Sequence, residues 1–338
     1  MNVKNTRAIR TAAREALAVH QNPKRIALVY AGLSAALSLA VTLISYILSL
    51  KIDQMSGLAN LGTRAIFSTA KSVLPVALFL FLLIWELGYQ TCVLRFARRR
   101  YVDLTDLKAG LPKFGTLLWT KLLMGMVYLG LGIACMYLSV FIFMALPISN
   151  AFYEIVAPLL DSATILNNGI VFDEATLAAA SAAMWPAIAI FGVVFIVAAL
   201  PLFYSFRMVP FCLADASRRS SIAILKESRT MMRRNRLSLL KLDLSFWWFF
   251  LLECLITSLA YLDVILPMVG VVLPWPDTVS YYGFYILSLA GQVALYWACL
   301  NRVNVSYACF YEAIRPQTPA QGIPLGNIFD LAKEYEES

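Results

Sequence analysis

The sequence predicts an all-α fold, a polytopic membrane bundle of six transmembrane helices with three amphipathic helices at its cytoplasmic surface. Hydrophobic residues make up 60% of the 338 residues and charged residues only 14%, whereas soluble domains have roughly 25% charged residues. Apolar stretches long enough to cross roughly 30 Å of hydrocarbon recur along the chain. Lysine and arginine are concentrated in alternate connections between these stretches, as in multi-pass membrane proteins. We therefore expect a single membrane domain.

The chain begins with a cytoplasmic amphipathic helix within residues 1–25. Ile9, Ala13 and neighbouring small residues share one side of this helix, and its arginines share the opposite side. A six-span membrane domain covers residues 26–311, and residues 312–338 form a cytoplasmic tail. The spans are expected at about 26–50, 72–94, 116–145, 184–206, 239–262 and 281–300.

A second amphipathic helix is expected around residues 104–111, in the connection after the second span. Asp103 or Thr105 could accept a free backbone N–H of its first turn and so begin the helix. A third amphipathic helix precedes the fifth span, so that each pair of spans follows one such helix. This order predicts three structurally similar units. The units are residues 1–94, 95–213 and 214–311.

The third amphipathic helix runs from about Ser220 to Asn235, with Ser220 or Ser221 as its expected N-cap. Its apolar side carries Ile224, Leu225, Met231 and Met232. Such a helix lies in the membrane interface, with its apolar side in the acyl boundary and its cations at anionic headgroups. The alternative is a basic loop that only fixes the membrane topology. The residues expected to bind lipid or to dock a partner are Arg218, Arg219, Lys226, Arg229, Arg233, Arg234 and Arg236.

All but three of the 28 lysines and arginines lie on one predicted side of the membrane. The exceptions are Lys51, Arg64 and Lys71, around the connection between the first two spans. Because cytoplasmic connections carry the excess of lysine and arginine, both termini are expected in the cytoplasm. The predicted location is the bacterial cytoplasmic (inner) membrane.

Several short motifs share a pattern with one bacterial family. They are Tyr204-x-x-Arg207-Met208-Val209-Pro210, Leu213-Ala-Asp215, Leu225-Lys-Glu-Ser228-Arg229-x-Met231-Met232, Leu242-Asp-Leu-Ser-Phe246 and Tyr307-x-x-Phe310-Tyr311. The sequence resembles the bacterial integral membrane family catalogued as domain of unknown function 975, most clearly from Tyr204 to Phe250. The resemblance implies a polytopic membrane fold. It implies no activity, because the family has no established one.

Four polar residues lie inside predicted spans: Glu86 and Gln90 in the second, Glu253 in the fifth and Gln292 in the sixth. Ionisable residues are costly within a bilayer, and by default they suggest a functional site. These four side chains could line a proton- or ion-coupled path. Alternatively, each carboxylate is protonated or hydrogen-bonded between helices and holds the bundle together.

Two structural features are expected near and within the spans. Arg207 and Asp243 lie near the inner ends of the fourth and fifth spans, where an ion pair between them would fix this hairpin. In the third span, Gly125, Gly130 and Gly132 are expected to allow close approach of another helix.

The sequence argues against an enzyme. It has no P-loop, no G-x-S-x-G and no H-E-x-x-H motif. His20 is the only histidine, and the six cysteines lack CxxC spacing, so no metal and no cofactor is expected. The net charge of +8 follows the cytoplasmic side of the membrane, and nucleic acid is therefore not an expected partner.

The leading functional hypothesis is a non-enzymatic subunit or accessory factor of a transport or envelope system. It would bind anionic lipid at its basic interfacial helices, and its protein partner would be a membrane protein or an ATPase. The alternative is a transporter or permease subunit with an intramembrane carboxylate path. A membrane enzyme acting on lipid through Glu86 or Glu253 is a third hypothesis, although neither carboxylate has an evident catalytic partner in the sequence.

Overall fold

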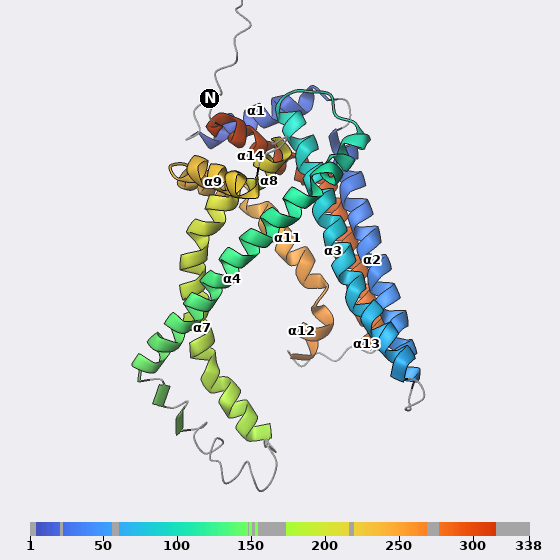
Figure 1. The fold of residues 1–338 in the computed structure, drawn as a ribbon, viewed down its shortest axis with the longest axis vertical. Coiled ribbons are helices and arrows are strands. Elements are labelled where there is room, and N and C mark those ends of the chain that lie inside the picture. The colour runs from blue at the N-terminus through green and yellow to red at the C-terminus, as the bar shows by residue number, and fades with distance from the viewer. Residues whose placement is uncertain are drawn as a thin grey trace, which may run out of the picture.

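The computed structural model describes residues 5–20, 23–55, 61–147, 149–150, 153–154, 174–215, 220–268 and 277–315, and the regular elements in these ranges are all helices (Figure 1). Within these ranges, five helical segments are long and apolar enough to cross a membrane. They are Pro23–Gln54, Gly62–Ala97, Leu104–Ala145, Met184–Asp215 and Val279–Ile314. The predicted all-α membrane fold is therefore confirmed, whereas the count of six spans is not.

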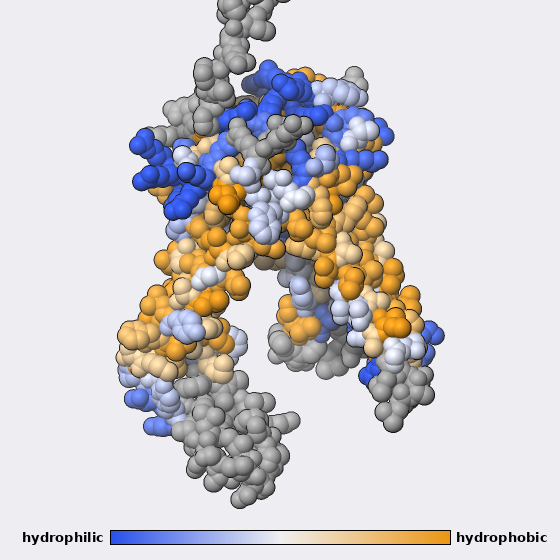
Figure 2. All heavy atoms as spheres, viewed as in Figure 1, coloured by the Kyte–Doolittle hydropathy of each residue, from blue (hydrophilic) through white to orange (hydrophobic). Residues whose placement is uncertain are grey.

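The long helices form two groups that diverge from one end of the molecule (Figure 1). In the first group, α2 (Pro23–Gln54) packs on α3 (Leu61–Ala97) and on α13 (Asp277–Leu295). In the second group, α4 (Phe114–Ala145) packs on α7 (Glu174–Phe206). Figure 2 shows the surface hollowed between the groups and hydrophobic residues covering both of them. Such surfaces suit contact with lipid chains.

The predicted span 239–262 is wrong as a single helix. The chain instead forms α10 (Arg236–Leu244), α11 (Trp247–Leu259) and α12 (Leu262–Met268). At 1.5 Å per residue, α11 is about 20 Å long, which is shorter than the roughly 30 Å of hydrocarbon in a bilayer. At the break after α10, the Ser245 hydroxyl donates a hydrogen bond of 2.7 Å to the Leu242 carbonyl in the last turn of that helix.

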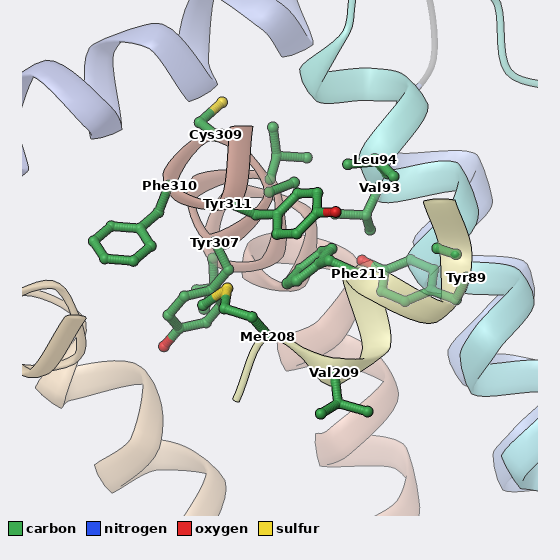
Figure 3. Packing of buried hydrophobic residues seen from close by; sticks show 14 of the residues in the cluster. Tyr89, Val93, Leu94, Met208, Val209, Phe211, Tyr307, Cys309, Phe310 and Tyr311 are labelled. Carbon is green, nitrogen blue, oxygen red and sulfur yellow. The ribbon is translucent and has the colours of Figure 1, made fainter. Parts of the chain in front are cut away.

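Several of the described helices close the end of the molecule where hydrophilic residues gather in Figure 2, and we call this the basic end. These helices are α1 (Thr6–Ala18), the 3₁₀ helix η2 (Leu104–Lys113), α8 (Val209–Asp215), α9 (Ser221–Met232), α10 and α14 (Asn301–Ile314). Most of the buried hydrophobic core lies here. Figure 3 shows Tyr89, Phe211 and Tyr311, from α3, α8 and α14, packed close to one another. Burial at the basic end therefore contributes most to holding the two groups of helices together.

Helices are present where the first and third amphipathic helices are predicted, but their apolar sides face protein. Ile9 of α1 is fully buried, and so are Ile224 and Met232 of α9, which packs on α4, α7 and α8. The predicted N-cap Ser220 is confirmed, because its hydroxyl accepts a hydrogen bond from the Ala223 N–H at 3.4 Å. The expectation that the apolar side of α9 lies in the acyl boundary is wrong, because the bundle itself covers that side.

The second amphipathic helix is η2, which begins after Asp103. The Asp106 carboxylate accepts a hydrogen bond from the Asp103 backbone N–H at 3.0 Å, and Thr105 donates to the Asp103 carboxylate at 3.0 Å. Hydrogen bonds from the Leu104 N–H and the Thr105 hydroxyl lower the pKa of Asp103. In chain order, α1 precedes α2 and α3, and η2 precedes α4 and α7, whereas α9 is followed by the shorter helices α10, α11 and α12 before α13.

The backbones of α3 and η2 approach each other closely at two glycines. A Cβ added at Gly88 would lie 2.6 Å from the carbonyl carbon of Leu107 and closer still to its oxygen. A Cβ at Gly110 would meet a carbonyl oxygen of α3 in the same way. Around Gly125 and Gly130, in contrast, a Cβ would find no atom within 4 Å. The expectation that these two glycines allow close approach is therefore wrong.

Candidate functional site

A pocket of about 300 Å³ lies where α3 and α4 meet the turn between α7 and α8. Its charged residues are Glu86 from α3, Lys121 from α4 and Arg207 from that turn. Lys121 Nζ lies 3.4 Å from Glu86 Oε2, and about one third of each side chain is exposed. The remaining lining residues are Met124, Tyr128, Phe203, Phe206, Val209 and Pro210.

The ion pair between Glu86 and Lys121 was not expected from the sequence, because the rotation of α3 relative to α4 cannot be read from either helix alone. Two cations and one carboxylate leave the pocket with a net positive charge beside apolar walls. Such an arrangement suits the anionic group of an amphipathic molecule.

Arg207 and Asp243 are close to the same tyrosine but do not form the predicted ion pair in the part of the chain that the structure describes. The Asp243 carboxylate accepts hydrogen bonds from the hydroxyls of Tyr204 at 2.9 Å and Tyr307 at 2.6 Å. The Arg207 guanidinium lies over the ring of Tyr307, 5.0 Å from its centroid, and over that of Phe203 at 5.3 Å. The predicted direct pair is thus replaced by contacts through Tyr307, which joins α14 to both residues.

The two predicted intramembrane carboxylates have different partners. Whereas Glu86 pairs with Lys121, Glu253 of α11 accepts a hydrogen bond of 2.6 Å from the Tyr296 hydroxyl. Gln292 of α13 donates to the Thr257 hydroxyl of α11 at 3.3 Å. The side-chain oxygen of Gln90 in α3 is buried and has no hydrogen-bond partner among the described residues. These contacts join α11 to α13 and α3 to α4, as expected of polar groups that hold helices together.

Basic residues form an exposed ridge along α9 and the turn that follows it. Lys226, Arg229, Arg233 and Arg234 are exposed, and none of the four forms an ion pair within the described ranges. Arg236 is half-buried, and its Nε is buried without a hydrogen-bond partner. The predicted residues Arg218 and Arg219 lie outside the described residues. Because the apolar side of α9 is fixed in the core, this ridge has a defined position at the basic end.

A polar network that the sequence analysis did not predict joins α3, α8 and α14. Arg98 follows α3 and contacts Asp215 at 2.9 Å and Glu312 at 2.7 Å. Asp215 also contacts Arg315 at 2.9 Å and accepts a hydrogen bond from Tyr311 at 3.3 Å. Asp215 and Tyr311 belong to motifs that carry the family resemblance, and these motifs were the one feature of the sequence that could have indicated the network. These motif residues therefore build the basic end.

His20 lies in another pocket of the basic end, with Arg25 and Asp103 in the same lining. Its ring packs edge-on against Phe96 with centroids 4.8 Å apart, and its Nε2 is buried without a hydrogen-bond partner among the described residues. Burial lowers the pKa of His20 because it disfavours the charged imidazolium. The packing thus favours a neutral histidine.

Neither a metal centre nor a known relative indicates an activity for this chain. In the described ranges, no three His, Cys, Asp or Glu residues are grouped so that they could hold a metal ion. No curated protein and no solved structure matches the chain. The model of the family described as "Protein of unknown function (DUF975)" matches residues 1–318. This match extends well beyond the motifs between Tyr204 and Phe250, and the chain therefore belongs to the DUF975 family.

Proposed function

We propose that this membrane protein is a non-enzymatic subunit or accessory factor of a transport or envelope system, and that its basic end binds anionic lipid. On this proposal it resides in the bacterial cytoplasmic membrane, with both termini and the basic end in the cytoplasm. The positive-inside bias of its lysines and arginines supports this orientation. The protein partner would be a membrane protein or an ATPase that docks on the same end.

The observation that carries the proposal is the exposed ridge of Lys226, Arg229, Arg233 and Arg234, whose cations form no ion pair with any residue that the structure describes. A cation already paired with a carboxylate gains little from an anionic surface, whereas an unpaired one near that surface contributes roughly 1 kcal/mol. The core contacts of α9 fix the helix that carries Lys226 and Arg229 and that leads into the turn with Arg233 and Arg234. A rigid basic ridge beside a lipid-facing bundle suits both headgroups and an acidic protein surface.

Charge reversal tests this proposal. The variant Lys226→Glu/Arg229→Glu changes exposed side chains of α9 and leaves its buried side intact. The matched control Arg64→Glu/Lys71→Glu makes the same change on exposed residues of the first turns of α3, at the opposite end. Each protein is extracted into lipid nanodiscs, and bound lipids and proteins are identified by mass spectrometry. We expect enrichment of anionic lipid and recovery of partners to drop in the α9 variant only.

If the α9 variant retains both its anionic lipids and its protein partners, the proposal is refuted. An equal loss in the control would indicate a general effect of net charge and would equally contradict a role for the ridge. The melting temperature of each variant is measured in parallel, so that a loss caused by unfolding is recognised.

A transporter or permease subunit is the second candidate, and the pocket at Glu86, Lys121 and Arg207 favours it. A carboxylate in a pocket between helices can exchange a proton or bind a cation. Reconstituted in liposomes without any partner, a transporter would show a proton or ion flux that Glu86→Gln abolishes. For an accessory factor, we expect no such flux from the wild-type chain.

A further inference from the structure

A second pocket, of about 310 Å³, lies where the turn between α9 and α10 meets α7. Arg233, Arg234 and Arg236 line one part of it, and Leu200 and Leu237 line another. Figure 2 shows hydrophilic residues of the α9 region directly above the hydrophobic surface of α7. The pocket therefore stands at the boundary between a basic surface and an apolar one.

The charged part of this pocket lacks an internal counterion. None of the described residues that line it is an aspartate or a glutamate. The nearby carboxylate of Asp243 is engaged by the hydroxyls of Tyr204 and Tyr307. The Nε of Arg236 is buried and has no hydrogen-bond partner in the described part of the chain. A buried donor without an acceptor is unfavourable, so the Nε of Arg236 is left unsatisfied by the described part of the protein.

The geometry of the arginine side chain points to phosphate. A planar guanidinium donates two parallel hydrogen bonds to a phosphate group, and clusters of arginine favour this ligand over weaker anions. A single phosphate group has enough acceptor oxygens for more than one guanidinium. Three arginines at one pocket therefore suit the binding of one phosphodiester.

The apolar part continues along α7 away from the basic end. Val193, Val197 and Leu200 follow one another at helical spacing and are exposed by 64%, 69% and 48%. Val193 lies about 10 Å along the helix from Leu200, at 1.5 Å per residue. Leu237, at the mouth of the pocket, is 73% exposed. An acyl chain that leaves the pocket along α7 would therefore contact apolar side chains from its first carbons onward.

We propose that this pocket binds one anionic glycerophospholipid, with its phosphate held by Arg233, Arg234 and Arg236 and one acyl chain lying along Val193, Val197 and Leu200. The inference rests on the proposed function for the position of the basic end at the headgroups. It goes further, because it assigns one specific site that binds one lipid per chain. The ridge alone would attract several anionic lipids without binding any of them at a defined position. A water-soluble phosphate would use the arginines but not the apolar stripe.

The test compares two variants that remove the same charge. Arg234→Gln/Arg236→Gln removes two cations of the pocket, and Lys226→Gln/Arg229→Gln removes two from the ridge outside it. Full-length protein in detergent is titrated with phosphatidylglycerol, and bound lipid is counted by native mass spectrometry. We expect one tightly bound lipid per wild-type chain, at least about tenfold weaker binding in the pocket variant, and little change in the ridge variant.

Each other outcome overturns the assignment. Equal weakening in both variants would show diffuse attraction to the basic end, which refutes the pocket but agrees with the proposed function. Unchanged binding in the pocket variant would place the lipid elsewhere. Glycerol phosphate, the headgroup without chains, is titrated in parallel, and binding as tight as that of the phospholipid would make the ligand a soluble phosphate. Melting temperatures show whether either variant unfolds.

Discussion

Replacing Gly88 with alanine should destabilise the junction between α3 and η2. The new methyl group would lie 2.6 Å from the carbonyl carbon of Leu107 and closer to its oxygen. The obstructing atoms belong to backbone, which cannot rotate away as a flexible side chain can. Since the Leu107 side chain is only 1% exposed, a shift of η2 would also withdraw that side chain from the core.

The expected loss can be worked from these contacts. Overpacking costs typically about 1–3 kcal/mol, and a clash with backbone belongs at the upper end of that range. Alanine is favoured over glycine within a helix by about 1 kcal/mol. The net destabilisation for Gly88→Ala should therefore be about 2 kcal/mol.

The assay is reversible unfolding in mixed detergent micelles, followed by helical circular dichroism. Gly125→Ala is the matched control, because it makes the same substitution in α4, where a Cβ would meet no atom within 4 Å. We expect this control to unfold at the wild-type denaturant concentration or slightly above it. Equal midpoints for the two variants would show that the close contact of α3 with η2 does not exist.

Three further predictions concern the basic end. Burial lowers the pKa of His20 below its ordinary value of 6.5, so at mildly acidic pH the unfolded chain binds a proton at this histidine and the folded chain does not. The contribution of His20 to folding stability should therefore be complete above about pH 6.5 and should decline as the pH falls toward the pKa of the folded state. His20→Gln should flatten the dependence of the melting temperature on pH between about 7 and 5, and an unaltered slope would contradict this. Tyr307→Phe removes a hydrogen bond of 2.6 Å to the Asp243 carboxylate and should cost about 1.5–3 kcal/mol in detergent unfolding; a wild-type midpoint would argue against the bond. Ser228→Ala removes a buried hydrogen bond of 2.8 Å to a carbonyl of α7 and should cost about 1 kcal/mol, whereas the exposed control Thr230→Ala should be neutral; equal effects would refute the distinction.

The sequence predicted those features that depend on hydropathy and local chemistry. The first apolar segment and the N-cap at Ser220 were found because both follow from residues next to one another in the chain. Gly88 and Gly125 look alike in the sequence, and their different surroundings arise only when helices distant in sequence meet. The break before Phe246 was missed because neither glycine nor proline marks it.

The partners of the charged groups could not be predicted from the sequence either. Glu86 was noticed because a carboxylate in an apolar run is costly, but its contact with Lys121 depends on how α3 and α4 are rotated. For Asp243, an ion pair with Arg207 was predicted because Arg207 is the nearest opposite charge in the neighbouring span. Two tyrosine hydroxyls, one from α7 and one from α14, occupy the carboxylate instead. Tyr307 contributes from a helix that the sequence places far from either residue.

The packing of α1 on α14 ties the first described helix to the last. Asn301, the first residue of α14, also donates a hydrogen bond to the Pro23 carbonyl, across a separation of 278 residues. During synthesis, the apolar side of α1 leaves the ribosome long before the helix that covers it, and contacts of such long range form late. A chain cut short before α14 would lack the helix that packs on α1. The packing at the basic end is therefore completed only after α14 has been made.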